Sequence, residues 1–382
     1  MEFRDLKKQY VFMQKEIDEG IAGVIRNSNF ISGKPIAELE NQLAEYVGVK
    51  HCITCANGTD ALNLALMVWK IGKGNAVFVP DFTFFASGEV ISYHGATPIF
   101  VDVNVETYNI DCRDLERKIK KILAEGQLYP RAIVAVDLFG QPADYDAIKP
   151  IAQKYGLRIL EDAAQGFGGQ IRNKMAGSFG DISTTSFFPA KPLGCYGDGG
   201  AIFTDHDEWA TVLRSLCVHG KGSGKYDNVR IGVNSRLDTM QAAILLPKLS
   251  AFRSFERDKV NELAARYSRK LANIVKVPVV KEDFTSSWAQ YTVQLKDKEM
   301  RNALQIYLKQ HSIPSMVYYP KPMHLQKAFQ MEQDIVENYL TTETLCDTVL
   351  SLPIHPYMEE TEQDIVIDAI FDFFADYSCA QK

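Results

Sequence analysis

The amino-acid sequence predicts an α/β fold, with a large domain built on a mostly parallel central sheet and a smaller C-terminal α+β domain. Between residues 50 and 165, short apolar runs rich in β-branched residues alternate with helical patterns. This alternation is typical of a parallel sheet covered by helices on both faces. After about residue 205 the pattern changes, because a basic, glycine-rich loop precedes a long charged helical stretch. The length of 382 residues corresponds to two or three domains of roughly 150 residues.

The predicted elements of the large domain follow one another in a regular order. Strands are predicted at 52–54, 76–79, 98–101, 132–137 and 158–161, and helices at 59–69, 84–93, 113–124 and 144–155. The last of these helices has Pro142 and Asp144 at its start and Gly156 at its end, which are the positions that these residue types favour.

A long helical pattern over residues 239–273 predicts a spine between the two domains. Beyond it, strands are predicted at 291–295 and 315–318, and helices at 299–311 and 362–374. We therefore expect a large domain over residues 1–250, which includes the N-terminal segment, and a small domain over residues 251–382.

Composition and charge argue against several classes of protein. Hydrophobic residues make up 46% of the chain and charged residues 24%, which is ordinary for globular proteins and not for disordered or fibrous ones. The 48 acidic residues outnumber the 42 basic ones, giving a net charge of -6, whereas nucleic-acid-binding proteins usually carry a basic surplus. No uncharged apolar run reaches the ~18 residues of a membrane span, and the N-terminus lacks the apolar core of a signal peptide. We expect a cytoplasmic protein that binds neither nucleic acid nor a membrane.

The seven cysteines are scattered along the chain, as is usual in a reducing compartment. Cys52 and Cys55 have the C-x-x-C spacing of redox and zinc sites, but no second pair follows them. We expect both to be buried on a strand, and we expect no metal site.

One lysine lies in an unusually constrained setting. Lys191 belongs to the segment SFFPAKPLGCYGDGG, between two prolines that stiffen the backbone and ahead of glycines that allow close approach to a flat ligand. A lysine held in this way can act as a nucleophilic amine and form a Schiff base with a carbonyl group. An exposed loop lysine explains this segment, taken alone, equally well.

The segment LEDAAQG follows the strand predicted at 158–161. A carboxylate at the C-terminal end of a parallel strand lies at the crevice where α/β proteins bind ligands, and pyridoxal phosphate needs a carboxylate beside its ring nitrogen. Alternation along the strand turns Glu161 to the other side, so Asp162 is the candidate ring contact. Gln165 is the candidate partner of the phenolic oxygen. The alternative role for Asp162 is the N-cap of a helix.

A phosphate site is predicted at the start of the helix at 59–69. The turn ANGT joins a strand to this helix, and backbone N–H groups and the helix dipole favour an anion there, although an Asn-Gly turn that only caps the helix is also common. The candidate phosphate contacts are Gly58 and Thr59, with a hydroxyl from Ser186. Aromatic residues beyond the strand at 76–79 could stack on a ring, but core packing explains at least two of the three, which are Phe82, Phe84 and Phe85.

Taken together and in order, these segments resemble the DegT/DnrJ/EryC1/StrS family of pyridoxal phosphate-dependent nucleotide-sugar aminotransferases. The NGT-D-AL turn, the EDAAQ block, the SFFPAKPLGCYGDGG loop and the segment GVNSRLD followed by QAA all match, and the resemblance covers nearly the whole chain. It implies a fold-type I, aspartate aminotransferase-like architecture and a homodimer with shared active sites.

The resemblance also implies roles for individual residues. Lys191 would be the lysine that forms the Schiff base with pyridoxal phosphate. Some relatives carry histidine there and act as dehydratases, so the lysine favours transamination. The other implied cofactor contacts are Asp162 at the ring nitrogen, Gln165 at the ring hydroxyl, Phe84 on the ring face, Gly58, Thr59 and Ser186 at the phosphate, and Asn234 at the phosphate of the neighbouring subunit.

The lysine loop is most similar to the branch that acts on UDP-2-acetamido-2-deoxy-3-oxo-D-glucuronate. That branch makes the 3-amino sugar of bacterial surface polysaccharides such as O-antigen, with L-glutamate as the usual family donor. A uronate and a diphosphate need basic partners, and the loop at 219–236 supplies Lys221, Lys225, Arg230 and Arg236. The segment YYPKPMHL matches a family segment near the sugar. The candidate substrate contacts are therefore Arg236, Tyr318, Tyr319 and His324.

Other functions are compatible with the same sequence. The nearest is an aminotransferase for another 3-keto or 4-keto sugar, including 6-deoxy hexoses, carried on dTDP or UDP. A pyridoxal phosphate-dependent sugar dehydratase, a non-catalytic regulator with this fold and a nicotinamide-dependent oxidoreductase are further alternatives. The presence of Lys191, Asp162 and Gln165 counts against a regulator, and the fold alone does not choose between these functions.

Overall fold

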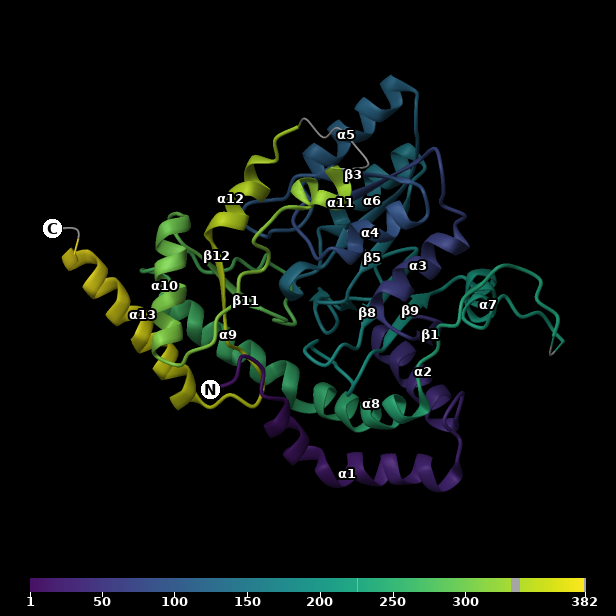
Figure 1. Cartoon of the computed structure of the whole chain (residues 1–382), viewed down its shortest axis with the longest axis horizontal. Helices are drawn as coiled ribbons and strands as arrows, with labels where there is room; N and C mark the ends of the chain where they lie inside the picture. Colours follow the sequence, from purple (N-terminus) through teal and green to yellow (C-terminus); the bar gives the residue numbers. More distant parts are fainter. Residues whose placement is uncertain (225, 331–336, 381–382) are drawn as a thin grey trace.

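The computed structural model describes residues 1–224, 226–330 and 337–380. The strands of its central sheet are β1 (His51–Cys55), β2 (Asn75–Pro80), β3 (Thr97–Val101), β4 (Tyr129–Val136), β5 (Arg158–Asp162), β8 (Ile182–Ser186) and β9 (Gly200–Thr204). They are arranged in the order β1-β9-β8-β5-β4-β2-β3 (Figure 1). Neighbouring strands run parallel except at β9, which is antiparallel to both β1 and β8. The predicted mostly parallel sheet is therefore confirmed.

Helices cover both faces of this sheet (Figure 1). They are α3 (Gly58–Val68), α4 (Ala86–Tyr93), α5 (Cys112–Glu125), α6 (Tyr145–Tyr155) and α7 (Asp207–Leu216). Side chains of β2 alternate between two cores: Val77 and Val79 pack with α3, α4 and α7, whereas Ala76 and Phe78 pack with α5 and α6. A strand buried on both faces reads as a continuous apolar run, which is why the sequence pattern located β2 correctly.

The N-terminal segment and the long helix of the second half pack together. α1 (Leu6–Asn27) lies along α8 (Thr239–Ala251), so closely that a Cβ on Gly20 would lie 3.1 Å from the carbonyl oxygen of Ala243 (Figure 1). α2 (Lys34–Val47) follows α1 and leads to the sheet. α8 continues through a π-helical turn (Phe252–Glu256) into α9 (Arg257–Leu271). The long helix expected over residues 239–273 is thus present, with one widened turn.

The C-terminal part has a core of its own. Its elements are β11 (Tyr291–Gln294), β12 (Val349–Leu352), α10 (Lys298–Gln310), α12 (Leu340–Thr348) and α13 (Glu360–Ala380). Leu263 of α9 shares one apolar cluster with Tyr291, Leu304 and Ile370. The segment between β11 and β12 also reaches the core beside α3 and α4 through Met323. The division of the chain at residue 250 stays a prediction.

The strand predicted at 315–318 is reduced to an isolated bridge between Met316 and Ser351. On one side of this bridge an antiparallel ladder would next join Pro314 to Pro353, and neither residue has an N–H to donate, so the ladder ends there. The remaining short elements are β6 (Gln170–Ile171), β7 (Lys174–Met175), β10 (Phe284–Thr285), α11 (Lys327–Gln330) and 3₁₀ turns at Leu138–Gly140 and Met323–Leu325.

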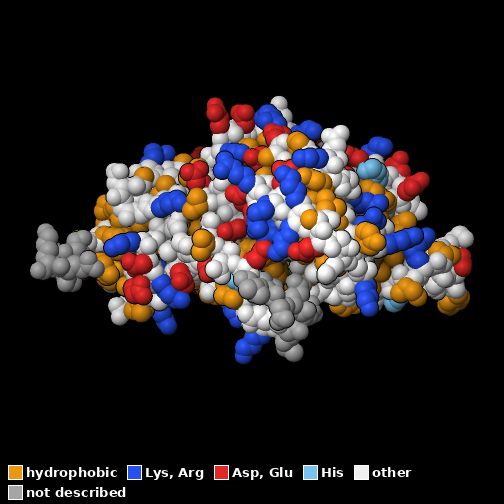
Figure 2. All heavy atoms as spheres, turned by 90° about the horizontal axis from the view of Figure 1, so that it is seen from above, with side chains coloured by type: hydrophobic (Ala, Val, Ile, Leu, Met, Phe, Trp, Pro, Cys, Tyr) orange, Lys and Arg blue, Asp and Glu red, His pale blue; other side chains and the backbone are white. Residues whose placement is uncertain are grey.

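The molecular surface carries both signs of charge. Figure 2 shows one face on which basic and acidic side chains are interspersed. On α5, for example, Arg117, Lys118 and Lys121 all lie within ion-pair distance of Glu337. Among the helices of the described residues, none combines the length and apolar character that crossing a bilayer requires.

Candidate active site

A cavity of about 860 Å³ opens at the C-terminal ends of the central strands. Its lining includes Val136 at the end of β4, Asp162 at the end of β5 and Ser186 at the end of β8. Ligands of α/β proteins bind at this edge of the sheet, and the volume suits a cofactor together with part of a substrate. The facing wall is formed by residues of the segment 318–326, from the C-terminal part of the chain.

Most of the residues predicted from the sequence line this one cavity, although they are scattered over more than 250 positions of the chain. They are Gly58, Thr59, Phe84, Asp162, Gln165, Ser186, Lys191, Tyr318 and Tyr319. Three predicted residues do not line it: Asn234, Arg236 and His324.

Lys191 lies on a tight turn after β8. Its backbone N–H donates to the carbonyl oxygen of Phe188 at 2.8 Å. The turn needs glycine at Gly194, because a Cβ there would lie 2.5 Å from the carbonyl oxygen of Pro189. Burial lowers the pKa of Lys191, Asp162 opposes this effect, and Arg4 lowers the pKa further. A lowered pKa favours the neutral amine that nucleophilic chemistry requires.

Asp162 is buried at the end of β5 and accepts two hydrogen bonds. Ser87 Oγ donates to its Oδ2 at 2.8 Å, and the N–H of Ala164 donates to its Oδ1 at 3.2 Å. Burial raises the pKa of Asp162, whereas both hydrogen bonds and Lys191 lower it. As alternation predicts, Glu161 points to the opposite side, where the N–H of Phe179 donates to its Oε2 at 2.7 Å. Only Asp162 of this pair lines the cavity.

Gln165 has a fixed amide orientation. The backbone N–H of Phe139 donates to its Oε1 at 2.8 Å, and its Nε2 donates to the hydroxyl of Tyr319 at 2.9 Å. Because a backbone N–H can only donate, the oxygen of the Gln165 amide must face Phe139 and the NH₂ group must face Tyr319. Gln165 therefore presents a hydrogen-bond donor on the side of Tyr319.

The first turn of α3 and the end of β8 form a narrow backbone cradle. Asn57 caps α3 by accepting from the N–H of Asp60 at 2.7 Å. A Cβ on Gly58 would lie 2.7 Å from Cβ and 3.2 Å from Oγ of Ser186, so only glycine fits there without displacing the serine. The N–H groups at the helix start, together with the Thr59 and Ser186 hydroxyls, make a site for an anionic group.

The three phenylalanines after β2 have different environments. Phe82 is 1% exposed and Phe85 packs against the core, as core packing predicts. Phe84 is 54% exposed and lines the cavity, with its ring 6.3 Å from the ring of Tyr319. Phe84 and Tyr319 thus form an aromatic edge over the opening.

His324, which is predicted to contact the substrate, does not line the cavity of this chain. Its side chain is buried, with Nδ1 2.6 Å from Asp81 Oδ2, and its backbone N–H donates to Asp81 Oδ1 at 2.8 Å. The ring also packs on Tyr339, with 4.6 Å between the ring centroids. These contacts join the chain after β2 to the segment 318–326. His324 therefore connects the two walls of the cavity from behind instead of facing into it.

Asn234 and Arg236 lie on the segment that leads into α8. Asn234 is exposed and forms an isolated bridge with Val218, and Arg236 is half-buried. The resemblance assigns Asn234 to the cavity of a neighbouring subunit, so its position in one chain leaves that assignment a prediction. Lys225, in the basic loop before it, lies outside the described residues.

Three residues that the sequence reasoning missed also line the cavity: Ser87, Gln290 and Lys321. Ser87 lies in the first turn of α4, 75 positions from the carboxylate to which it donates, so no local pattern could identify it. Lys321 had a usable signal, because it stands between Pro320 and Pro322 in the segment already recognised from its neighbours.

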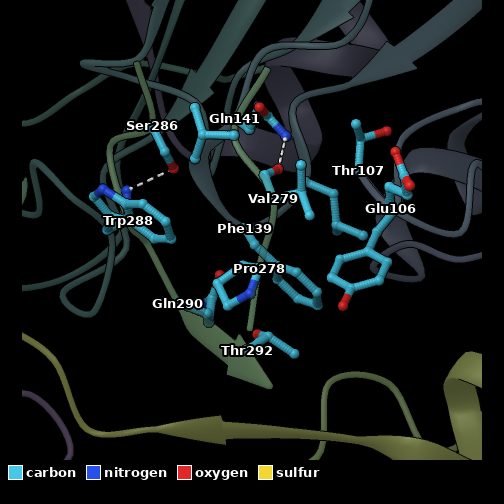
Figure 3. A pocket seen from close by; sticks show the side chains of 13 residues that line it. Glu106, Thr107, Phe139, Gln141, Pro278, Val279, Ser286, Trp288, Gln290 and Thr292 are labelled. Atoms are coloured by element: carbon cyan, nitrogen blue, oxygen red, sulfur yellow. Dashed lines mark hydrogen bonds between the residues drawn. The ribbon is translucent and has the colours of Figure 1, made fainter. Parts of the chain in front are cut away.

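A second, much smaller crevice lies beside the cavity. Figure 3 shows Phe139, Gln141, Val279, Ser286 and Trp288 around it, with a hydrogen bond from Gln141 Nε2 to the carbonyl oxygen of Val279. Its volume of about 20 Å³ has room for roughly one water molecule. It is too small for a cofactor, so the large cavity is the candidate active site.

Comparisons with known proteins agree with this geometry. The sequence pattern of the DegT/DnrJ/EryC1/StrS aminotransferase family matches residues 12–371. The UDP-2-acetamido-2-deoxy-3-oxo-D-glucuronate aminotransferase of Pseudomonas aeruginosa is 42% identical over 97% of this chain and 99% of its own length. The dTDP-3-amino-3,6-dideoxy-alpha-D-galactopyranose transaminase of Aneurinibacillus thermoaerophilus is 39% identical over 96% and 98%. A crystal structure of a family aminotransferase from Brucella abortus superposes with a TM-score of 0.95, at 47% identity, over 98% of this chain and 99% of that one.

Proposed function

Because the chain belongs to the DegT/DnrJ/EryC1/StrS aminotransferase family of pyridoxal phosphate-dependent enzymes, we propose that it aminates UDP-2-acetamido-2-deoxy-3-oxo-D-glucuronate with L-glutamate as donor. The product is the 3-amino sugar nucleotide used for bacterial surface polysaccharides such as O-antigen. The observation that carries the proposal is that Lys191 and Asp162 line one cavity with an anion cradle at one side. The named substrate of the Pseudomonas aeruginosa relative supports the choice of sugar.

The side chains at the cavity fit pyridoxal phosphate, which needs an anion site, a carboxylate and an amine. We assign its phosphate to the cradle at the start of α3, where the absent Cβ of Gly58 keeps Ser186 close. When bound, the cofactor supplies an electron sink for the carbon that carries the amino group. The proposed contacts are Gly58, Thr59 and Ser186 for the phosphate, Asp162 for the ring nitrogen, Gln165 for the ring hydroxyl, Phe84 for the ring face and Lys191 for the covalent linkage.

In this proposal, Lys191 carries the proton during the reaction. With the cofactor and donor bound, a neutral Nζ of Lys191 would accept a proton from the α-carbon of the donor and would donate it again on the other side of the transferred nitrogen. Burial favours the neutral form. Ionised Asp162 would hold a proton on the ring nitrogen, and Ser87 favours that ionised form by donating to Oδ2.

We assign the sugar nucleotide to the wall that contains Tyr318, Tyr319 and Lys321. The cationic side chains among the described lining residues are Lys191 and Lys321. Lys191 serves the cofactor, so Lys321 is the cation available to an anionic group of the substrate. Arg236 stays a proposed substrate contact that would act from a neighbouring subunit.

We further propose that the enzyme is a cytoplasmic homodimer in which each chain completes the active site of the other. Asn234 and Arg236 lie outside the cavity of their own chain, as a role in the neighbouring site requires. Sedimentation velocity tests the assembly, and mixing an Asn234→Ala chain with a Lys191→Ala chain tests the sharing. Recovery of activity in the mixture supports shared sites, whereas two independent sites per dimer would give no recovery.

The visible absorption spectrum tests the proposed function most directly. A yellow protein whose band bleaches on addition of L-glutamate would carry the cofactor and perform the first half of the transfer. The 3-oxo-uronate nucleotide should then restore the band, whereas a non-uronate keto-sugar should restore it slowly. A protein that shows no band after pyridoxal phosphate is added would overturn the proposal.

The variant Gly58→Ala is expected to weaken binding of pyridoxal phosphate by roughly 10-fold or more. The new methyl group would overlap Ser186 Cβ at 2.7 Å, and overpacking of this kind typically costs about 1–3 kcal/mol. Equilibrium dialysis of the apoprotein measures the dissociation constant. Gly72→Ala is the matched control, since its nearest neighbour would be the carbonyl oxygen of His94 at 3.7 Å. Equal affinity in both variants would remove Gly58 from the phosphate site.

The variant Lys321→Gln is expected to weaken binding of the sugar nucleotide by about 10- to 100-fold, the usual range for loss of a hydrogen bond to a charged group. Calorimetry of the holoenzyme with UDP, UDP-N-acetylglucosamine and its C6 uronate identifies the group involved. Loss confined to the uronate assigns Lys321 to the carboxylate, and equal loss for all three assigns it to the diphosphate. Lys327→Gln, on the exposed start of α11, is the control. Unchanged affinity for every ligand would contradict the assignment.

A further inference from the structure

We propose that Arg4 is a positioning residue for Lys191. It ties the segment ahead of α1 to the loop that carries Lys191, and it brings a positive charge close to that loop. The inference rests on the role proposed for Lys191. Nothing in the sequence pattern points to it, because Arg4 and the lysine loop are separated by most of the large domain.

The contact is direct. Arg4 Nη2 donates to the carbonyl oxygen of Pro192 at 3.1 Å, across 188 positions of sequence. Pro192 is the next residue after Lys191, whose own N–H is bonded to the carbonyl oxygen of Phe188 on the other side. The turn that carries Lys191 is therefore held from both ends. Phe3, beside Arg4, packs edge-on against Tyr318 of the cavity wall, with 6.3 Å between ring centroids.

The segment that carries Arg4 is anchored independently of it. Asp5 caps α1 by accepting from the N–H of Lys8 at 2.8 Å. Lys8 Nζ pairs with Glu362 of α13 at 2.8 Å, and Gln9 Nε2 donates to Glu256 of the π-helical turn at 3.0 Å. Arg4 is thus delivered to the lysine loop by contacts with two other parts of the chain.

The charge of Arg4 is not neutralised by a contact ion pair. Among the described residues, no carboxylate oxygen forms a salt bridge with its guanidinium group. Glu256 accepts hydrogen bonds from Gln9 and from the Tyr357 hydroxyl at 2.6 Å. Burial lowers the pKa of Arg4, and the charge of Glu256 raises it. Two other basic side chains lie in the same region. Burial lowers the pKa of Lys248, on α8, to about 8 and that of His355, after β12, to about 4, and in both cases Arg4 lowers it further.

The positive form of Lys248 is disfavoured mainly by burial; Arg4 adds to this effect and Glu256 opposes it. The side chain of Lys248 is 1% exposed, and its Nζ has no hydrogen-bond partner and lies 4.7 Å from the ring centroid of Tyr196. The same field reaches Lys191, where Asp162 favours the ammonium form and Arg4 opposes it. A neighbouring cation is one of the established ways in which a protein keeps a lysine amine neutral and reactive.

The test is the titration of Lys191 in the apoprotein. It is measured as the rate at which acetic anhydride labels the amine of Lys191 at each pH. In Arg4→Gln the pKa of Lys191 should rise, because a cation that lowers it is removed, so labelling below that pKa should slow several-fold. Arg4→Lys keeps the positive charge and should label almost as the wild type does. Mass spectrometry of the peptide that contains Lys191 gives the rate.

The matched control is Lys8→Met, which removes the ion pair to Glu362 from the same segment but retains Arg4. It should leave the titration of Lys191 unchanged. An unchanged titration in Arg4→Gln would overturn the inference, and an equal shift in Lys8→Met would assign the effect to anchoring of the segment and overturn it as well. Labelling uses no cofactor, so its outcome is separate from bleaching by L-glutamate, on which the proposed function stands or falls.

Discussion

Replacement of Lys191 with alanine is expected to reduce transamination by at least about 10⁴-fold, because it removes both the covalent link to the cofactor and the group that carries the proton. The fold should survive, since the side chain of Lys191 belongs to no apolar core and its turn is closed by backbone hydrogen bonds. Single-turnover kinetics with L-glutamate measure the loss, and thermal unfolding of the apoprotein reports on the fold.

Two comparisons separate the chemistry of Lys191 from its charge. Lys191→Arg keeps a positive charge but cannot supply a neutral amine, so it should be as inactive as the alanine variant. Addition of a small primary amine should restore part of the proton transfer in Lys191→Ala and none in Lys191→Arg, where the cavity remains filled. Lys174→Ala, on the exposed edge of β7, should behave as the wild type. Transamination by Lys191→Ala at a normal rate would show that another residue does this work.

The sequence predicts the fold well where local patterns coincide with tertiary burial. β2 is apolar from Ala76 to Pro80 because both of its faces are covered, and the helix over 144–155 has recognisable residues at each end. The prediction was wrong at 315–318, where the pattern of a strand is present but only Met316 forms a bridge, to Ser351. Whether such a segment pairs depends on the register between two distant segments, which no single-sequence pattern contains.

In the candidate site, too, residues with a local sequence signature could be predicted and residues that depend on distant partners could not. Asp162, Lys191 and the turn at Gly58 could be located because strand ends, proline-flanked loops and helix starts have local signatures. His324 could not be placed, since a histidine near prolines gives no sign that its partner is Asp81, 243 positions away. Ser87 and Arg4 are further examples, because each acts through one long-range hydrogen bond. Side chains whose partners are distant in the sequence are therefore much of what sequence reasoning missed.

The variant Asp162→Asn is expected to lower kcat by on the order of 10³-fold, the usual scale for removing one preorganised electrostatic contact. Asparagine has nearly the same shape, and Ser87 can still bond to its side chain, so the cavity should keep its form. What is lost is the negative charge that holds a proton on the ring nitrogen of the cofactor. Steady-state kinetics with saturating L-glutamate measure this loss. Ser87→Ala should be milder. The hydrogen bond from Ser87 lowers the pKa of Asp162, so its removal raises that pKa. As the pH is lowered, the activity of Ser87→Ala should therefore begin to fall at a higher pH than that of the wild type.

In Asp162→Asn, the stability of the apoprotein should stay the same or rise while the activity of the enzyme falls. Burial raises the pKa of Asp162 above its unfolded value, so the folded apoprotein binds the proton more tightly than the unfolded chain does. Its stability therefore falls as pH rises through that range, and Asp162→Asn removes this penalty. At neutral pH the apoprotein of Asp162→Asn should unfold at a temperature equal to or above that of the wild type. If Asp162 served only as a structural hydrogen-bond acceptor, the same substitution would spare kcat, because asparagine keeps an acceptor oxygen in a side chain of nearly the same shape. The value of kcat therefore distinguishes a group retained for chemistry from one retained for structure.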